Sequence, residues 1–269
     1  MPAYFWSCAA LSDRGLRRDR NEDNFYLDGA YLPEGGGAPG MKTAGPMNGG
    51  VAAVFDGLGG EKAGDYAAYT AARLLDGYRA SLRACRDGER VKTVTETYLR
   101  EVNAALRARG DALGGGCGST LALLVFRSGI AHVLNLGDSR VYLLRAGKLT
   151  QLSRDHTLAA YLCARGELTP EEAQRDPRRN ALTRHLGARE GELGLSPYFL
   201  PQIPVLPGDR FLLCSDGVSG MLADQEITRV LKAARSAAVC AETLVRLAVK
   251  SGGRDNATAL CAFVSFRLF

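Results

Sequence analysis

Hydrophobic residues recur at helical spacing in four segments of the chain, and this spacing predicts four amphipathic helices. The predicted helices span residues 65–84, 91–107, 224–234 and 237–250. The first pair and the last pair are separated by a long block with strand-like patterns. Such an order favours an α+β architecture, in which helices cover sheets, over an alternating βαβ arrangement.

Short apolar runs and period-two alternation predict the strands. The predicted strands span residues 24–32, 51–55, 210–215 and 257–269. Residues 119–152 also alternate with period two, with turns at Ser128-Gly129 and Ala146-Gly147, which is typical of an antiparallel meander. The runs at 51–55 and 210–215 are apolar on both faces, so we expect these strands to be buried.

Two regions lack a clear period. Residues 33–50 are dense in glycine and proline, and we predict a long surface loop between two strands. Residues 153–194 are polar, charged and partly helical, which indicates an irregular subdomain between core strands. We find no internal repeat, and the pattern as a whole predicts one domain over residues 1–269.

Composition narrows the class of protein. The chain has 269 residues, of which 46% are hydrophobic and 23% charged, as in ordinary globular proteins. The formal net charge of +5 is mild, and the dispersed arginines form no stripe that would predict nucleic-acid binding. The sequence shows neither a signal peptide nor an apolar run of membrane-spanning length. Seven cysteines without a C-x-x-C pair predict reduced core thiols, so we expect a cytoplasmic protein.

Four aspartates lie beside apolar runs or predicted strands, where an unpaired charge is energetically unfavourable. Asp56 and Asp216 directly follow apolar runs and precede glycines, Asp138 follows the run H-V-L-N-L-G, and Asp255 precedes the last predicted strand. Carboxylates that converge from strand ends repel one another, and a hard cation such as Mg²⁺ or Mn²⁺ relieves that repulsion. The alternative interpretation is that each Asp-Gly pair is a simple turn signal. Four acids placed in this way together favour a metal centre.

The segment D-R-G-L-R-R-D-R-N-E-D, residues 13–23, combines guanidinium groups with the acids Glu22 and Asp23. Arginine forks suit a phosphate dianion, although a solvated charged loop is the plainer interpretation of such a run. The three histidines, His132, His156 and His185, have no ligand-like spacing, and we interpret them as structural.

Eight motifs in register across about 250 residues identify a resemblance. They are R-R-D-R-N-E-D (17–23), V-F-D-G-L-G-G (54–60), G-C-G-S-T-L (116–121), N-L-G-D-S-R-V-Y (135–142), D-H-T (155–157), R-R-N-A-L-T-R-H-L-G (178–187), L-L-C-S-D-G (212–217) and G-R-D-N-A-T (253–258). The chain resembles the metal-dependent protein phosphatase family, also called protein phosphatase 2C, and its bacterial members in particular. The resemblance implies a four-layer α/β/β/α sandwich with a mobile flap at about 153–194.

The resemblance also implies a function and a site. Members hydrolyse phosphoserine and phosphothreonine on proteins with a water activated between two Mn²⁺ or Mg²⁺ ions. By motif position, Asp56 bridges both ions with help from the Gly57 carbonyl, and Glu22 reaches one of them through water. The remaining positions imply that Asp216 and Asp255 complete the first ion's shell, that Asp138 binds a weaker third ion, and that Arg18 binds the phosphate. The catalytic set is then Arg18, Asp56 and Asp216. The implied partners are phosphorylated proteins and a cognate serine/threonine kinase, with no nucleic acid, no membrane and a monomeric chain.

Two departures and two rival hypotheses accompany the resemblance. Leu58 stands where some members have a histidine proposed as general acid, and Gly220 stands where an acid often supports the third ion. Cys240 and Arg246 have the spacing of a cysteine phosphatase, but without a glycine-rich anion loop. The second rival is a catalytically weak or dead member that acts as a phosphoprotein-binding regulatory module.

Overall fold

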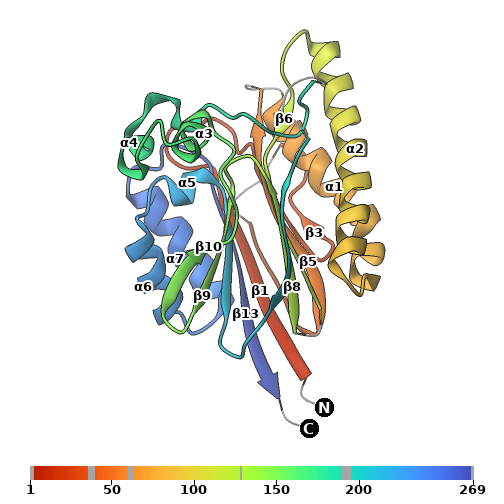
Figure 1. Ribbon diagram of the computed structural model, residues 1–269, viewed down its shortest axis with the longest axis vertical. Coiled ribbons are helices and arrows are strands. Elements are labelled where there is room, and N and C mark those ends of the chain that lie inside the picture. The colour runs from red at the N-terminus through yellow and green to blue at the C-terminus, as the bar shows by residue number, and fades with distance from the viewer. Residues whose placement is uncertain (1–2, 36–39, 60–62, 128, 190–194, 268–269) are drawn as a thin grey trace.

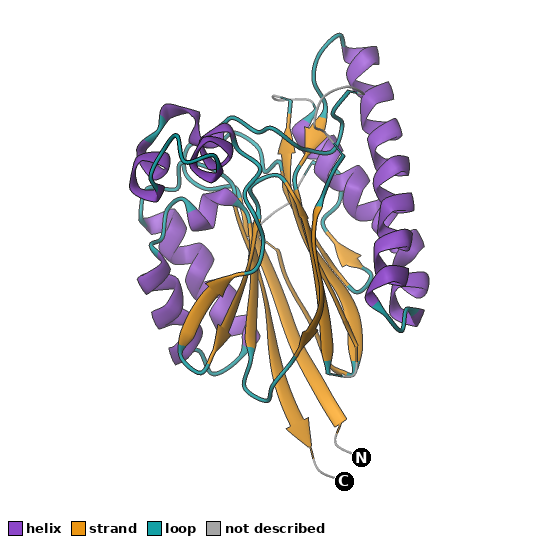
Figure 2. Ribbon diagram, viewed as in Figure 1, coloured by secondary structure: helices purple, strands orange, loops and turns teal. Residues whose placement is uncertain are grey.

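Two antiparallel sheets pack face to face, and helices cover both outer faces (Figures 1 and 2). The computed structural model describes residues 3–35, 40–59, 63–127, 129–189 and 195–267. The predicted four-layer α/β/β/α sandwich is therefore confirmed. No helix among these residues is both long enough and apolar enough to span a lipid bilayer.

The first sheet has six strands. In spatial order they are β10 (Lys148–Gln151), β9 (Arg140–Arg145), β12 (Arg210–Cys214), β13 (Ala257–Arg267), β1 (Ala3–Asp13) and β4 (Gly40–Met47). The long central strands β1 and β13 pair along their whole length, from Ala3 opposite Arg267 to Asp13 opposite Ala257. The two described ends of the chain therefore lie together at one end of the sandwich (Figure 1).

The second sheet follows the order β11 (Tyr198–Pro204), β8 (Ile130–Leu136), β7 (Leu121–Arg127), β5 (Gly49–Leu58), β2 (Asp23–Leu27) and β3 (Ala30–Tyr31). The short strand β6 (Gly118–Ser119) pairs with the end of β5. All these pairs are antiparallel. In such a sheet the end of one strand lies beside the start of its neighbour, and this geometry positions the site described below.

Helices α1 (Gly64–Ala84) and α2 (Gly88–Leu113) cover the second sheet, and α6 (Asp224–Ala233) and α7 (Ala237–Lys250) cover the first (Figure 2). Their limits follow from local chemistry. The Asp87 carboxylate caps α2 by accepting from the Arg90 amide, and the Ser236 hydroxyl caps α7 in the same way. Helix α2 ends at Gly114, which adopts the left-handed conformation that suits glycine.

Three hydrophobic layers fill the spaces between the four structural layers. Strand β5 shows why its sequence is apolar throughout. Val51, Ala53 and Phe55 face the helices α1 and α2, whereas Ala52 and Val54 face the other sheet. Because both faces of this strand are covered, period-two alternation is lost.

Small helices occupy the region predicted as an irregular subdomain. They are α3 (Leu158–Ala164), α4 (Pro170–Arg175) and the 3-10 turn η1 (Pro177–Asn180). Thr169 and Glu172 form a capping box at the start of α4. An isolated bridge between Thr157 and Leu182 joins the start of this region to its later part. A second bridge, between Leu186 and Ser119, connects the region to strand β6.

Three sequence-based predictions need correction. The loop predicted over residues 33–50 is wrong for most of its length, because β4 pairs with β1 as an edge strand and β5 begins at Gly49. An edge position tolerates the bend at Gly45 (φ 109°), where the pairing with β1 shifts register. The predicted strand 24–32 is a hairpin that turns at Asp28-Gly29. The predicted meander changes sheet after β8, and strand β11 was not predicted.

Candidate active site

The acidic residues meet at one end of the sandwich. Asp56 lies near the end of β5, beside the start of β2, where Glu22 and Asp23 stand. Asp216 follows β12, and Asp255 precedes β13, the strand that pairs with β12. Antiparallel pairing therefore gathers residues that are far apart in the sequence, as the 2.8 Å hydrogen bond from the Glu22 amide to Asn256 Oδ1, 234 residues away, shows.

Asp56 is held by its backbone. Its amide donates to Thr120 Oγ1 (3.0 Å), and its carbonyl accepts from the Thr120 amide (2.8 Å). The next residue must be glycine, because a Cβ at Gly57 would clash with the carbonyls of Gly64 and Glu22. The Asp56 carboxyl is thus presented on a rigid strand end rather than on a loop.

Asp23 joins the two sheets below the other acids. Its buried carboxyl accepts hydrogen bonds from Ser215 Oγ and Thr258 Oγ1, both at 2.6 Å. Ser215 precedes Asp216, and Asp23 is the cross-strand partner of Asp56. Asp23 therefore fixes the spacing between the strands that carry these two acids. This role of Asp23 is not visible in the sequence, where it stands as one more acid beside Glu22.

Burial and mutual repulsion raise the pKa values of most of these carboxyls. Desolvation is the largest cause at every one of them. The pKa of Asp56 lies well above its ordinary value, with Asp23 and Asp216 as the next causes. The pKa of Asp23 rises to about 7 and that of Asp138 to about 8. The pKa of Glu22 is also raised, although the Arg18 charge opposes the shift.

Asp216 has a carboxyl oxygen that lacks a hydrogen-bond partner in the described part of the chain. Its Oδ1 is buried and has no hydrogen-bond partner among the described residues. Desolvation and the charge of Asp255 raise its pKa, whereas a hydrogen bond with the Asp56 carboxyl lowers it. Two carboxyls in hydrogen-bond contact, one with an orphaned oxygen, form a place where positive charge is stabilising.

Asp138 lies in the turn between β8 and β9, at the same end of the sandwich. The Gly137 amide donates to His156 Nδ1 (3.1 Å), which fixes this turn. Arg140 binds Asp155 through its Nε and Nη2, with the shortest contact at 2.6 Å. The Arg140 charge lowers the pKa values of Asp138 and Asp216, but it does not offset the cost of their burial.

Arg18 and Asp255 form the outer part of the site. Arg18 Nη2 lies 2.7 Å from Asp255 Oδ2, and 49% of the Arg18 side chain is exposed. The hydrogen bond to Asp255 is the largest cause that raises the pKa of Arg18, and the charges of Asp255, Glu22 and Asp56 add to it, so the guanidinium faces the acids while it remains open to solvent. An exposed guanidinium beside an acidic centre can receive a phosphate.

These residues fit hard divalent cations. The donors are carboxylate and carbonyl oxygens, which Mg²⁺ and Mn²⁺ prefer, and Asp216 Oδ1 awaits a partner. Among the described residues, no three Asp, Glu, His or Cys side chains enclose an ion by themselves. Ions held here would therefore complete their shells with backbone carbonyls and water, as hard cations commonly do.

The structure brings the predicted site residues together. Cys240 and Arg246, the pair that the cysteine-phosphatase hypothesis requires, are not part of this group. The carboxyls of Glu22, Asp56, Asp138, Asp216 and Asp255 and the guanidinium of Arg18 influence one another electrostatically. Cys240 is wholly buried within α7, and Arg246 is exposed and paired with Glu242, so they form no anion loop.

Each histidine makes a hydrogen bond with the backbone, and six of the seven cysteines are buried. His132 accepts from the Gln202 amide (3.3 Å), His156 binds Gly137, and His185 Nδ1 lies 2.8 Å from the Leu186 carbonyl oxygen. All seven cysteines are free thiols, and only Cys163 is not buried.

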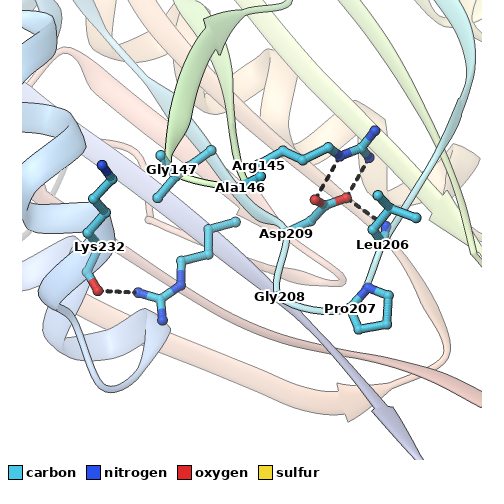
Figure 3. A pocket seen from close by; sticks show the side chains of 10 residues that line it. Arg145, Ala146, Gly147, Leu206, Pro207, Gly208, Asp209 and Lys232 are labelled. Carbon is cyan, nitrogen blue, oxygen red and sulfur yellow. Dashed lines mark hydrogen bonds and ion pairs between the residues drawn. The ribbon is translucent and has the colours of Figure 1, made fainter.

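A separate hollow lies at the other end of β12 (Figure 3). Its volume is about 410 Å³, and the turn Ala146-Gly147, residues 206–209 and Lys232 line it. Arg145 and Asp209 bind each other there at 2.6 Å, and Arg210 donates to backbone carbonyls at the end of α6. These charges stabilise the fold, and the hollow takes no part in the acidic centre.

Known proteins resemble this chain over most of its length. The family profile "Protein phosphatase 2C" matches residues 43–251. The chain is 35% identical to the serine/threonine phosphatase stp of Listeria welshimeri, over 93% of this chain and 92% of that protein. It is 34% identical to the serine/threonine protein phosphatase PstP of Mycobacterium tuberculosis, over 95% of this chain but only 44% of that longer protein.

Solved structures agree with these matches. The crystal structure of the Mycobacterium tuberculosis PstP superimposes with a TM-score of 0.79 at 31% identity, covering 97% of this chain and 99% of that one. The catalytic domain of PstP in complex with two manganese ions has a TM-score of 0.76 at 32% identity, covering 98% of this chain and 100% of that one.

Proposed function

This chain belongs to the protein phosphatase 2C family, and on that premise we propose that it hydrolyses phosphoserine and phosphothreonine monoesters on proteins. It is a metal-dependent protein serine/threonine phosphatase that uses Mn²⁺ or Mg²⁺. One observation carries the proposal: the exposed guanidinium of Arg18 lies 2.7 Å from Asp255, at the rim of a buried acidic centre that contains the orphaned Asp216 Oδ1. A phosphate bound at Arg18 would therefore lie beside the cations that these acids hold.

Each acid is assigned a part in holding the ions. Asp56 and the Gly57 carbonyl would hold two ions, Asp216 and Asp255 would complete the first shell, and Glu22 would contact the second ion through water. Asp138 would hold a weaker third ion. When bound, such ions lower the pKa of water and neutralise charge on phosphoryl oxygens.

The chain's own residues position the reactants. Arg18 would bind the equatorial phosphate oxygens and stabilise the charge that they carry in the transition state. Asp23, with its bonds to Ser215 and Thr258, keeps the strands of Asp56 and Asp216 at a fixed spacing. No covalent intermediate on the protein is needed, because positioning and electrostatic stabilisation account for the reaction.

Leu58 occupies the position of the histidine that is proposed as general acid in some members. An aliphatic side chain cannot donate a proton. We therefore assign protonation of the departing serine or threonine oxygen to a water molecule at the acidic centre. Turnover should then show no ionisation of an imidazole in its pH profile.

The partners follow from the substrate class. Phosphorylated proteins are the substrates, and a serine/threonine kinase that phosphorylates the same proteins is the natural counterpart. All the assigned ligands come from one chain, so a monomer suffices. The free thiols, of which six are buried, suit a reducing compartment, and we place the protein in the cytoplasm.

A phosphopeptide assay tests the proposal. We expect turnover of phosphoserine and phosphothreonine peptides with Mn²⁺, loss of all turnover in EDTA, and recovery when Mn²⁺ or Mg²⁺ is added. A dead regulatory member would bind phosphopeptides without releasing phosphate. Full activity after exhaustive chelation, with metal analysis to prove removal, would refute metal dependence.

A further inference from the structure

Two loops beside the acidic centre form one surface, which we call the arginine platform. It comprises residues 14–20, between β1 and β2, and residues 252–256, between α7 and β13. The Leu16 amide donates to the Gly253 carbonyl (2.8 Å). Gly15 packs so closely on the backbone of Asp255 that a side chain there would clash. The two loops therefore form a single unit.

Asn256 holds the backbone of the arginine platform in place. Its buried side chain donates to the carbonyls of Arg14 (2.9 Å) and Arg20 (2.8 Å), and its Oδ1 accepts from the Glu22 amide (2.8 Å). One side-chain amide thus satisfies two backbone carbonyls of the first loop and the backbone amide of Glu22, which follows that loop. A surface fixed in this way loses little conformational entropy when a ligand binds.

Besides Arg18, the arginine platform carries four exposed arginines against one exposed acid, Asp19, so its net charge is positive. Arg14, Arg17, Arg20 and Arg254 are all exposed. Within the described part of the chain, Arg17 and Arg254 have no ion pair, and Arg14 donates only to the backbone carbonyl of Asp19 (3.2 Å). Arg20 forms an ion pair with Asp65, with Nη1 and Oδ2 3.6 Å apart.

This charge is distinct from that of Arg18, which is directed at the acids and bonded to Asp255. Arg18 nevertheless marks where the phosphate group binds, and it belongs to the same loop. An extended peptide advances about 3.3 Å per residue, so residues within about three positions of the phosphorylated one pass over the arginine platform. Guanidinium groups bind carboxylates through paired hydrogen bonds.

We propose that the arginine platform selects phosphorylation sites flanked by aspartate or glutamate. The inference rests on the phosphatase activity proposed above and names the substrate class of that site. Arg17 and Arg254 are its specificity-determining residues, because their guanidinium groups are exposed and have no carboxylate partner in the described chain. Exposed ion pairs are individually weak, so several must act together, and salt must weaken the preference.

Three phosphothreonine peptides test the proposal, identical except for glutamate, glutamine or lysine at the flanking positions. At low salt with Mn²⁺, we expect kcat/KM for the glutamate peptide to exceed that for the lysine peptide by about tenfold, with glutamine between them. Near 0.5 M salt the ratio should fall to about twofold. Ratios within about twofold at low salt would overturn the proposal.

Matched variants assign the effect to the arginine platform. The double variant Arg17→Gln/Arg254→Gln should reduce the glutamate-to-lysine ratio to about twofold. Arg73→Gln/Arg229→Gln removes the same charge from exposed positions on α1 and α6 and should retain the full ratio. An unchanged ratio in the first variant, or an equal decrease in the second, contradicts the proposal.

Failure of the platform proposal can be distinguished from failure of the proposed phosphatase function. If no phosphopeptide and no p-nitrophenyl phosphate is hydrolysed with metal, the phosphatase assignment itself fails. If p-nitrophenyl phosphate and all three peptides are hydrolysed without preference, only the platform inference fails. The ratio between peptides is the readout, so a general loss of activity in a variant does not imitate loss of selectivity.

Discussion

Arg18 and Asp255 form an ion pair across the rim of the acidic centre, with Nη2 and Oδ2 2.7 Å apart. The pair links the residue assigned to the phosphate with a residue assigned to a cation. Both side chains are partly exposed, at 49% and 34%, so solvent screens the attraction and the pair can open. Arg18 can therefore exchange Asp255 for a phosphate without leaving a buried charge unpaired.

Arg18→Ala should lower kcat/KM for p-nitrophenyl phosphate by about 2–4 kcal/mol, because a charge-assisted contact with the phosphate is lost. Arg17→Ala should cost less than about 1 kcal/mol with this substrate, since Arg17 makes no ion pair with the acids in the described structure. Steady-state kinetics at saturating Mn²⁺ measures both. Equal losses would show that the phosphate-binding arginine has been misassigned.

Asp56→Asn and Asp216→Asn should each lower kcat by about a thousandfold or more, because each removes charge that holds a cation at the reacting water. The fold should survive. Both carboxyls have raised pKa values, so removing either charge relieves repulsion, and the chelated variants should melt no lower than the parent. A variant that keeps activity within about tenfold of the parent contradicts the assignment.

Asp138→Ala should affect only the weaker cation. Gly220 provides no carboxylate near this site, and fewer charged ligands give weaker binding. We expect calorimetric titration with Mn²⁺ to show two ions bound at micromolar concentration in both proteins. A third ion should bind at millimolar concentration in the parent alone. If Asp138 only orders its turn, the variant will instead melt earlier and keep the parent's metal activation.

The chelated protein should lose stability as pH rises from about 6.5 to about 8.5. Asp23 and Asp138 have folded-state pKa values near 7 and 8, above those of the unfolded chain, so the folded state holds more protons in this window. Stability then falls with pH, by at most about 1.4 kcal/mol per pH unit for each group. His156, whose pKa is lowered to about 4, has the opposite effect below about pH 6.5.

Melting curves in EDTA across this window provide the measurement. Saturating Mn²⁺ should flatten the dependence, because bound cations displace the protons. Asp138→Asn removes one of the two groups and should reduce the slope. A melting temperature that does not fall between pH 6.5 and pH 8.5 would show that these carboxyls are already ionised in the folded state.

The acids could be singled out from the sequence because a charge at the end of an apolar strand is energetically unfavourable, and the neighbouring residues alone reveal that situation. Asp56 and Asp216 each follow an apolar strand, and such strands place their ends at a sheet edge whatever the rest of the fold is. The role of Asp23 was not visible in this way. It depends on hydroxyl groups of Ser215 and Thr258, which lie 192 and 235 residues away and become neighbours only when the two sheets pack.

Strand β4 escaped prediction for a different reason. Its glycines and proline disfavour a strand when only local preference is considered, but pairing with β1 supplies the backbone hydrogen bonds that define it. The change of sheet between β8 and β9 was also invisible, because period-two alternation is the same whichever sheet a strand joins. Helix α7 was predicted with its observed limits, since Ser236 caps its start within the local sequence.

The pairing of β1 with β13 has a practical consequence for how this enzyme can be tethered. Ala3 and Arg267 are partners at one end of these strands, whereas Asp13 and Ala257 are partners at the end that carries the acids. A purification tag, a fluorescent reporter or a surface linker joined beyond Ala3 or Arg267 would leave from the end of the sandwich opposite the acids. Immobilised through either strand, the enzyme would keep its acidic centre directed away from the support.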